Sequence, residues 1–595
     1  MSSESTQAPG LRDSKRLRWV YLALSLLSRA RIGSRHRVFL LAVVIGVAGA
    51  LSSYLFKELV HGINHLMTGT SSKGYVDAFQ HLSLLQRILI PTIGSALAGL
   101  LLMAGKRIDT RQATDYMEAV ALGNGDVPAR PSILKSVAAA CSIGSGVSIG
   151  REGPLVQLAA VGASILGRLL REPPARLRLL VACGAAAGVA AAYNAPIGGA
   201  IFVAEIIIGS IAVESLGPLL VASVASTITI RAIDPNLVSY SIQTPFESGL
   251  LSVLLFAMLG ILCGFAAPLF IATLKTGKRI FAPIRLPLPI KLGIGGLLFG
   301  LIAAFHPEVA GNGQSVIRGM LDGMFTWQTI AMLALLKILA VTVVFGSGTV
   351  GGVFTPSLLV GASLGYLWSV LLLHQLGFAI IPPEVSALVG MGCFLAAATH
   401  APFMAVFLLF EMCLHPGILI PLTVSTLFSY SIARSLGGAS LYLESLQSGP
   451  KSVFDKDIAT LTVSEIVRPQ GSRTLPSSTF GEIATRFLRA SEDMLPVTDP
   501  DGRFLGSILL QDVRPYLKER VLADSIIARD IMREDIRTLD ASFDLPHALR
   551  TFSETGQPSL PVTDSKTGIL LGMLEKNDLY LVVSEITRRA GVHST

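Results

Sequence analysis

Glu152 is the residue whose chemical type is least expected from its surroundings. It lies in the segment Gly150-Arg151-Glu152-Gly153-Pro154, which interrupts a long apolar stretch of the sequence. Ionised carboxylates are costly to bury, so a carboxylate inside such a stretch is a functional candidate by default. A carboxyl group can also change its charge by binding a proton. We therefore expect Glu152 to act as a gate and proton acceptor, with a local ion pair to Arg151 as the alternative.

The segment around Glu152 has a counterpart later in the chain. Residues 144–154 and 346–356 both contain Gly-Ser-Gly, another glycine six residues after the first, and a proline at the end. Two downstream Ala-Pro pairs are each followed by a glutamate nine residues after the proline, at Glu205 and Glu411. These glutamates are expected to cap or pair near an interface. The common order, at offsets of 202 and 206 residues, indicates a duplication, and duplicated transport folds commonly have inverted halves.

The two glycine-rich breaks favour a cavity that attracts anions. A break inside an apolar stretch leaves backbone N–H groups that lipid cannot satisfy, so it must line a cavity enclosed by protein. Pro154 and Pro356 suit the first turn of a new helix, whose N-terminus directs N–H groups and a positive dipole end into that cavity. The second break, residues 351–356, has no charged side chain, so its backbone amides would bind the anion. Glycines that permit close helix packing are the alternative.

The elements that must position these residues are predicted to be membrane-spanning helices. The chain has 595 residues, of which 51% are hydrophobic and 15% charged, whereas soluble proteins carry about 25% charged residues. Its mean hydropathy is +0.61. Uncharged runs long enough for one or two spans occur at residues 38–56, 179–204, 249–274, 338–383, 385–410 and 412–433. This pattern predicts an all-α polytopic membrane protein and argues against an ordinary globular enzyme.

The basic residues are explained by the membrane rather than by nucleic acid. The net charge is +8, and eight of the arginines and lysines lie between Arg12 and Arg37, before the first strong span. The positive-inside rule then places the N-terminus in the cytosol. Residues 20–27 are apolar but too short to cross and lack a cleavage site, so residues 1–37 are predicted to be a basic cytosolic segment with an interfacial helix.

Other classes of chemistry lack support in the sequence. The five cysteines lie in apolar stretches without CxxC spacing, which predicts neither disulfides nor a metal site. Residues 146–150 match the GxSxG pattern of serine hydrolases, but no histidine lies between His81 and His306. There is no GxxxxGK[ST] loop and no HExxH motif. We therefore do not expect an enzyme.

Residues 451–595 differ in composition and contain a second repeat. The strong hydrophobicity ends after about residue 436. Pro-Val-Thr-Asp occurs at residues 496–499 and again at 561–564, followed in the two copies by Asp512 and Asp578. Each copy reads as helix, strand, Asp-rich turn, strand and helix. The sequence predicts a small cytosolic α/β domain built from two stacked repeats, about 461–520 and 526–590.

These motifs resemble those of the CLC family of chloride channels and chloride/proton antiporters. Residues 150–154 look like the family's GREGP, residues 352–356 like its GxFxP, and residues 437–442 like the segment that ends in its anion-binding tyrosine. The tail looks like the paired cystathionine-β-synthase (CBS) domains that follow some CLC membrane domains. The resemblance implies a membrane domain at 38–450 with inverted halves, about 38–235 and 248–446. It also implies a homodimer in an inner membrane, with one pore per subunit and both termini cytosolic.

The resemblance assigns roles to individual residues. It implies Glu152 as the gating glutamate, and the amides of Val353 and Phe354 with the hydroxyl of Tyr442 around a central chloride. Arg151 and Gly153, in the first motif, are taken as further anion-binding residues. The family's GSGxP falls near residues 110–114, where its glycines and serine are absent, so Thr110 or Thr114 is left to supply a hydroxyl.

The position of the antiporters' inner proton-transfer glutamate is occupied by Ile206, which cannot carry a proton. Glu205 is one residue earlier, about 100° away on a helix, and is the candidate for a relay by another route. We expect passive or proton-linked chloride transport gated by Glu152, with an uncoupled chloride channel as the alternative. A cation transporter that uses Glu152, Glu205 and Glu411 as ligands is a remote alternative, because residues 353–354 offer donors rather than carboxylates.

The tail departs from nucleotide-binding CBS domains. Those domains have Ser or Thr three residues before the ribose-contacting Asp, whereas here Leu509 precedes Asp512 and Glu575 precedes Asp578. Glu575 would repel phosphate. Adenine nucleotide at Asp512 and Asp578 is thus weakly supported, with stabilisation of a dimer as the alternative, and no other cofactor is expected.

Overall fold

The computed structural model divides the chain into two compact units, residues 1–446 and 447–595. Each unit is described by itself. The predicted interfacial helix at 20–27 lies outside the described residues. These are residues 34–579 except 71–73, 109–114, 122, 210, 235–239, 241–243, 377–380, 438–439, 443–460, 470–473, 490–493, 514–525, 556, 558 and 577.

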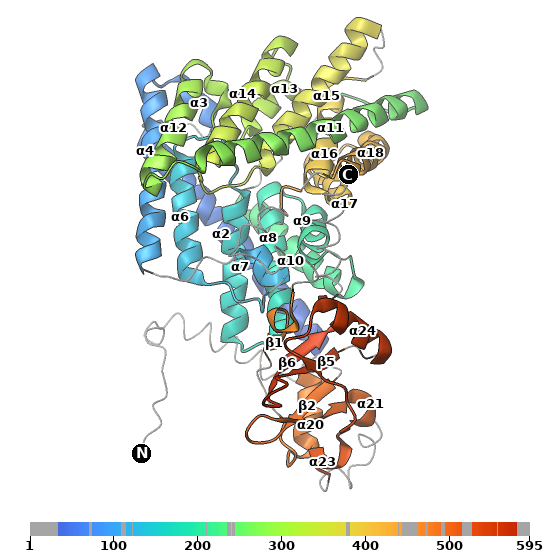
Figure 1. Ribbon diagram of the computed structural model, residues 1–595. Coiled ribbons are helices and arrows are strands. Elements are labelled where there is room, and N and C mark those ends of the chain that lie inside the picture. Colours follow the sequence, from blue (N-terminus) through green and yellow to red (C-terminus); the bar gives the residue numbers. More distant parts are fainter. Residues whose placement is uncertain are drawn as a thin grey trace. The chain divides into compact units, whose positions relative to one another are not determined.

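In the first unit, the regular elements among the described residues are helices, as predicted (Figure 1). Its first half contains α2 (Ser34–Thr68), α3 (Tyr75–Gln80), α4 (Leu84–Ile108), α5 (Tyr116–Ala121), α6 (Ala129–Gly144), α7 (Glu152–Leu169), α8 (Pro174–Tyr193), α9 (Pro196–Phe202), the π-helix η1 (Val203–Ile208) and α10 (Val213–Ile233). Its second half contains α11 (Leu250–Phe281), α12 (Leu288–Phe305), η2 (Pro307–Val309), α13 (Gln314–Leu321), α14 (Trp327–Gly346), α15 (Phe354–Leu376), α16 (Pro383–Thr399), α17 (Pro402–Cys413), η3 (Pro416–Ile418) and α18 (Leu419–Ser435).

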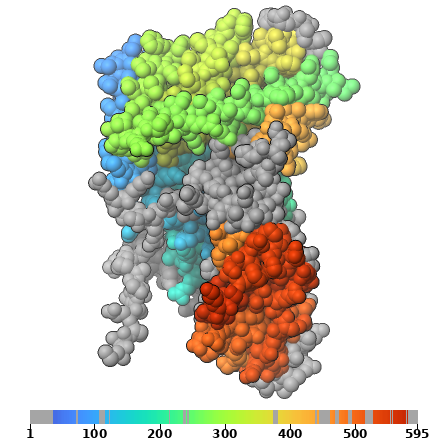
Figure 2. All heavy atoms as spheres, viewed as in Figure 1, coloured from blue at the N-terminus to red at the C-terminus, as the bar shows by residue number. Residues whose placement is uncertain are grey.

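Nine helices among the described residues are long and apolar enough to cross a membrane. Helix α11 is an example. Large apolar side chains are exposed along it, including Leu254, Met258, Phe265 and Leu269. This helix is the green band that crosses the face of the molecule in Figure 2. Apolar side chains exposed in a row along a helix suit contact with lipid rather than with water.

Two long apolar runs are each broken into two helices. Residues 179–204 fall into α8, α9 and the start of η1, and residues 385–410 fall into α16 and α17. The breaks occur at Asn194 and His400, whose φ values of 57° and 59° end α8 and α16 in the left-handed region. Ala-Pro follows in both places and starts the next helix, since proline suits a first turn. The duplication predicted from sequence is therefore visible in the helix ends.

The helices at the centre of each half pack closely because of small residues. A Cβ added at Gly184 of α8 would lie 2.7 Å from the carbonyl oxygen of Ala159 on α7. In the second half, a Cβ at Gly390 of α16 would lie 2.4 Å from the carbonyl oxygen of Gly361 on α15. Small residues at such contacts let helix backbones approach, as is common in membrane bundles. They hold α7 and α15, which carry the two motifs, against a buried neighbour.

The second unit has the α/β pattern predicted for the tail. Its first repeat contains α20 (Phe480–Arg489), β2 (Met494–Thr498), β3 (Phe504–Leu509) and α21 (Leu510–Val513). Its second contains α23 (Ala528–Ile531), β4 (Leu539–Asp540), α24 (Leu545–Thr555), β5 (Ser559–Thr563) and β6 (Leu570–Glu575). The strands form a two-stranded sheet β2-β3 and a four-stranded sheet β1-β6-β5-β4, where β1 is Arg468–Pro469. Each sheet has its own apolar core, but the cores do not follow the predicted repeat bounds. Leu461 and Val463 pack into the core of the four-stranded sheet, and Ala528 and Ile531 of α23 pack into the core of the two-stranded sheet.

Candidate functional site

The two glycine-rich breaks, 202 residues apart in the chain, contact each other. The N–H of Gly150 donates to the carbonyl of Gly352 at 2.6 Å, and the N–H of Gly352 donates to the carbonyl of Gly150 at 2.8 Å. The pair forms an isolated antiparallel bridge. The bridge thus joins the first motif, residues 150–154, to the second, residues 352–356, across the interface between the halves.

A helix begins directly after each partner of the bridge. Helix α7 starts at Glu152 and α15 starts at Phe354, so Pro154 and Pro356 both lie in a first turn, as predicted. The first N–H groups of a helix have no acceptor within that helix, and the aligned peptide dipoles add partial positive charge there. Two such ends meet beside the bridge. This arrangement favours a negatively charged group.

The carboxylate of Glu152 lies at this meeting point. Its side chain is 7% exposed, and its Oε1 accepts a hydrogen bond from the hydroxyl of Thr355 in the first turn of α15. Its Oε2 turns back toward the bridge, since a Cβ added at Gly150 or Gly352 would lie 2.0 or 3.2 Å from it. Within the described part of the chain, Oε2 has no hydrogen-bond partner.

Arg151 does not neutralise Glu152 through a direct ion pair. Its guanidinium donates instead to the side-chain oxygen of Gln314, at the start of α13, at 3.3 Å. Among the described residues, Glu152 takes part in no ion pair. The alternative expectation of a local pair is therefore wrong, and the partner of the Glu152 carboxylate comes from the other half of the unit.

Aromatic rings connect this point to Tyr442. The ring of Tyr193, the last residue of α8, lies 5.2 Å from that of Phe354 between centroids. Phe202 at the end of α9 is 6.5 Å from Phe354 and 5.5 Å from Tyr442, edge to face in both cases. The structure thus brings Glu152, Phe354 and Tyr442 into one neighbourhood, as the resemblance implied. Phe202, Tyr193 and Thr355 are members that the sequence did not indicate.

Some of the remaining predicted anion-binding residues lie at the helix starts, and others lie outside the described residues. Val353 and Phe354 are buried, 9% and 4% exposed, where α15 begins. Gly153 lies in the first turn of α7, close to Gly352. Thr110 and Thr114 lie outside the described residues, so the hydroxyl expected from that segment stays a prediction.

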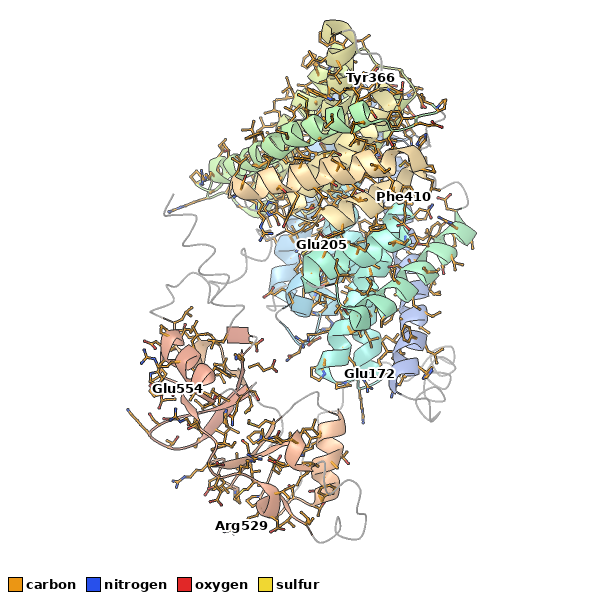
Figure 3. The ribbon with its side chains drawn as sticks, turned by 90° about the vertical axis from the view of Figure 1, so that its right-hand side faces the viewer. Glu172, Glu205, Tyr366, Phe410, Arg529 and Glu554 are labelled. Carbon is orange, nitrogen blue, oxygen red and sulfur yellow. The ribbon has the colours of Figure 1, made fainter. Side chains whose placement is uncertain are left out.

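Glu205 and Glu411 cap each other's half-helices. The carboxylate of Glu205 accepts the N–H groups of Phe403 and Met404 at 3.3 and 2.6 Å, at the start of α17. The carboxylate of Glu411 accepts the N–H groups of Ile197 and Gly198 at 3.0 and 2.8 Å, at the start of α9. Figure 3 labels Glu205 where helices of the two halves meet. A carboxylate at a helix N-terminus is stabilising, so the capping expectation is confirmed.

A buried lysine holds a loop against the first break. Lys337 of α14 is fully buried, and its ammonium donates to the carbonyls of Val309 at 2.9 Å and Gly311 at 2.6 Å. The N–H of Gly311 in turn donates to the carbonyl of Gly146 at 2.8 Å. Sequence reasoning missed Lys337 because it stands just before the uncharged run 338–383. Lys337 supports the backbone of the first break and does not itself contact Glu152.

In the second unit, the predicted nucleotide residue Asp512 already has a partner. Its carboxylate receives two hydrogen bonds from the guanidinium of Arg533, at 2.8 and 2.6 Å. The backbone of Arg533 also pairs with Ser507 on β3, which fixes the arginine beside this carboxylate. Asp578 follows β6 at the equivalent place in the second repeat. The described residues contain no group of three or more His, Cys, Asp or Glu able to hold a metal.

Comparison with known families gives two matches. The family described as voltage gated chloride channel matches residues 94–434, more than half of the chain. The family described as CBS domain matches residues 528–585. The first range includes both helix-start motifs and both capping glutamates. The second covers the latter repeat of the tail.

Individual proteins agree with these matches. A putative chloride channel protein ClcB-like from Ralstonia nicotianae is 43% identical over 412 residues, which are 68% of this chain and 96% of the relative. The voltage-gated ClC-type chloride channel ClcB of Escherichia coli is 34% identical over 410 residues, which are 67% of this chain and 97% of the relative.

Solved structures share the fold. A slow cyanobacterial Cl⁻/H⁺ antiporter has a TM-score of 0.60 at 24% identity, covering 70% of this chain and 98% of its own. A eukaryotic CLC transporter has a TM-score of 0.61 at 20% identity, covering 91% of this chain and 97% of its own.

Proposed function

Because this chain belongs to the voltage-gated chloride channel (CLC) family, with a CBS domain after the membrane part, we propose that it moves chloride through a pore gated by Glu152. The observation that carries the gate is the bridge between Gly150 and Gly352. It brings the starts of α7 and α15 together, with the Glu152 carboxylate between them. Chloride can bind at such a place without a full positive charge, because backbone N–H groups and helix dipoles suffice.

The gate follows from competition between two anions. When ionised, the Glu152 carboxylate occupies the anion position at the helix ends and excludes chloride. When protonated, it is uncharged and no longer competes with chloride for that position, so chloride enters. Partial charges bind an ion without trapping it, which conduction requires. The amides of Val353 and Phe354 and the hydroxyl of Tyr442 are the chloride ligands in this proposal, and Arg151 draws anions toward the site.

Chloride movement is proposed to be uncoupled from protons. Position 206, in η1, is isoleucine and carries no proton. The neighbouring carboxylate of Glu205 accepts two backbone N–H groups of α17, and these hydrogen bonds fix its position. A cap held in this way is a poor relay. The cation alternative has less support, since Glu205 and Glu411 face helix N-termini, where a cation is disfavoured.

The proposal also covers the assembly of the chain and its location in the cell. We assign the chain to a bacterial inner membrane as a homodimer with both termini cytosolic, in line with the basic N-terminal segment and the bacterial relatives. The paired CBS-like repeats are taken to stabilise that assembly. Adenine nucleotide is not assigned to Asp512, because a bidentate ion pair with Arg533 already satisfies its carboxylate.

A liposome experiment with two gradients tests the function. The purified full chain is reconstituted, and voltage is set with potassium and valinomycin while chloride and proton fluxes are recorded. We expect chloride efflux that stops at the chloride equilibrium potential, and no uphill proton movement when chloride runs down its gradient. A reversal at the cation potential contradicts the chloride assignment. Uphill proton pumping contradicts the uncoupled mechanism while leaving chloride transport intact.

A further inference from the structure

Two buried hydroxyl groups, neither in a predicted role, stand in line with Glu152. Thr355 in the first turn of α15 contacts the Oε1 of Glu152, and the phenol of Tyr193 at the end of α8 lies 3.2 Å from the hydroxyl oxygen of Thr355. Thr355 is 0% exposed and Tyr193 is 2% exposed. Water therefore does not compete for these hydrogen bonds. Three side chains from α7, α8 and α15 form one chain of contacts across the two halves.

The hydrogen bonds in this chain have a fixed direction. A hydroxyl has a single hydrogen to donate, and Thr355 donates its hydrogen to the carboxylate of Glu152. The hydrogen of Tyr193 is then directed to the hydroxyl oxygen of Thr355 or to the carboxylate of Glu152 itself, since Tyr193 contacts both. In either case both donors serve the carboxylate, directly or through Thr355. This direction suits an ionised acceptor, because a hydrogen bond to a charged group is about twice as strong as a neutral one.

Other charged or titratable groups act on the same carboxylate. Arg151 is next to Glu152 in the chain, and its positive charge acts on the carboxylate without forming an ion pair with it. The phenols of Tyr193, Tyr240 and Tyr442 are close enough for the charge of Glu152 to affect them. Among these groups, Tyr193 is the one linked to Glu152 through a hydroxyl relay. Its ring is also fixed by the contact with Phe354, so the hydroxyl is held in place.

We propose that Tyr193 and Thr355 form a hydroxyl latch that holds Glu152 in its closed position and sets the pH at which the gate opens. The proposal rests on the gating role assigned to Glu152 above. In the closed state, the charge-assisted bond from Thr355, strengthened by the bond from Tyr193, keeps the carboxylate beside the bridge. Protonation makes the bond neutral and roughly halves its strength, so the side chain leaves more readily. Both are positioning residues, since they act on chloride through Glu152.

The latch predicts the direction of a pH shift. It stabilises the ionised carboxylate, so removing a donor makes protonation easier and moves the opening midpoint to higher pH. Tyr193→Phe keeps the ring and removes the outer donor, and we expect a rise of about one pH unit, the equivalent of one ordinary hydrogen bond. Thr355→Val removes the direct donor, and we expect a rise of about one to two units. Thr355→Ser keeps the hydroxyl and should restore the native midpoint.

The readout is the pH midpoint of chloride flux in liposomes, which a loss of packing alone would not raise. Tyr366→Phe is the matched control, because it removes a phenol from α15 about 16 Å along the helix from Thr355 and should leave the midpoint unchanged. Each variant is also made in the Glu152→Gln background, where the latch has no carboxylate to hold. There, Tyr193→Phe and Thr355→Val should cause no further change.

The outcomes separate the latch from the gate. If Glu152→Gln removes the pH dependence but Tyr193→Phe and Thr355→Val leave the native midpoint in place, the latch is wrong and the gate stands. If the midpoint falls in these variants, the latch is also wrong, because the hydroxyls then favour the protonated form. If Glu152→Gln retains the pH dependence, the gating role itself fails. A rise in both variants, with rescue by Thr355→Ser, supports the latch.

Discussion

Replacement of Glu152 by glutamine is expected to abolish the pH dependence of chloride flux. In the native protein, each pH unit above the opening midpoint lowers the protonated fraction of one carboxyl about tenfold, and the flux should follow that fraction. Glutamine has the same shape but no charge to compete with chloride at the starts of α7 and α15. The flux of Glu152→Gln should therefore stay near its acid value at every pH. Chloride efflux from liposomes between acid and neutral pH measures this directly.

A second carboxylate provides the control for this experiment. Glu411 is half-buried, whereas Glu152 is buried, and it also faces a helix N-terminus, at the start of α9. Glu411→Gln removes one charge from the same unit without touching the bridge, so the pH dependence should survive. Retention of the pH response in Glu152→Gln, or its loss in Glu411→Gln, would mean that a different group titrates.

Gly150→Ala is expected to have the second large effect. A Cβ at this position would lie 2.0 Å from the Oε2 of Glu152 and 2.9 Å from the carbonyl oxygen of Gly352. The methyl group therefore meets both the carboxylate and the backbone bridge, and the bridge has no flexible side chain that can move aside. Overpacking of this kind costs about 1–3 kcal/mol, and it falls on the ionised carboxylate in its closed position. The pH midpoint of chloride flux should therefore rise by about one to two units.

Gly162→Ala is the matched control, because it makes the same change on α7 at a position with nothing within 4 Å of the added carbon. Its flux should equal that of the native chain. Both variants are first compared by size-exclusion chromatography in detergent, so that loss of the fold is separated from loss of function. Native flux and native pH response in Gly150→Ala would show that the space at the bridge is not used by the gate.

The architecture of the membrane part could be predicted largely from sequence because glycine and proline are conspicuous in apolar stretches. The breaks at 144–154 and 346–356 repeat with the same spacing, and both are followed by helix starts in the structure. The same signal marked Pro196 and Pro402. The run 179–204 nevertheless had the length of one span, and its division at Asn194 comes from the left-handed residue that ends α8.

The site could be predicted only in part because its contacts join distant segments. Glu152 was identifiable by itself, as a carboxylate in an apolar setting. Its partner Thr355 is 203 residues away, and Tyr193 is 162 residues from Thr355. A threonine and a tyrosine are ordinary in apolar helices, so their types gave no signal. The role of Glu205 had the same difficulty, because the N–H groups of α17 that donate to its carboxylate become apparent only when the halves pack.

An anion bound between the starts of α7 and α15 is the central expectation for this protein, and diffraction with bromide tests it most directly. Bromide replaces chloride and scatters anomalously, so crystals of the native chain and of Glu152→Gln grown in bromide reveal its position. We predict anomalous density beside the N–H groups of Val353 and Phe354 in both, and additional density next to the Gly150–Gly352 bridge in Glu152→Gln. Bromide found elsewhere in the membrane unit, with none between these helix starts, would contradict the account.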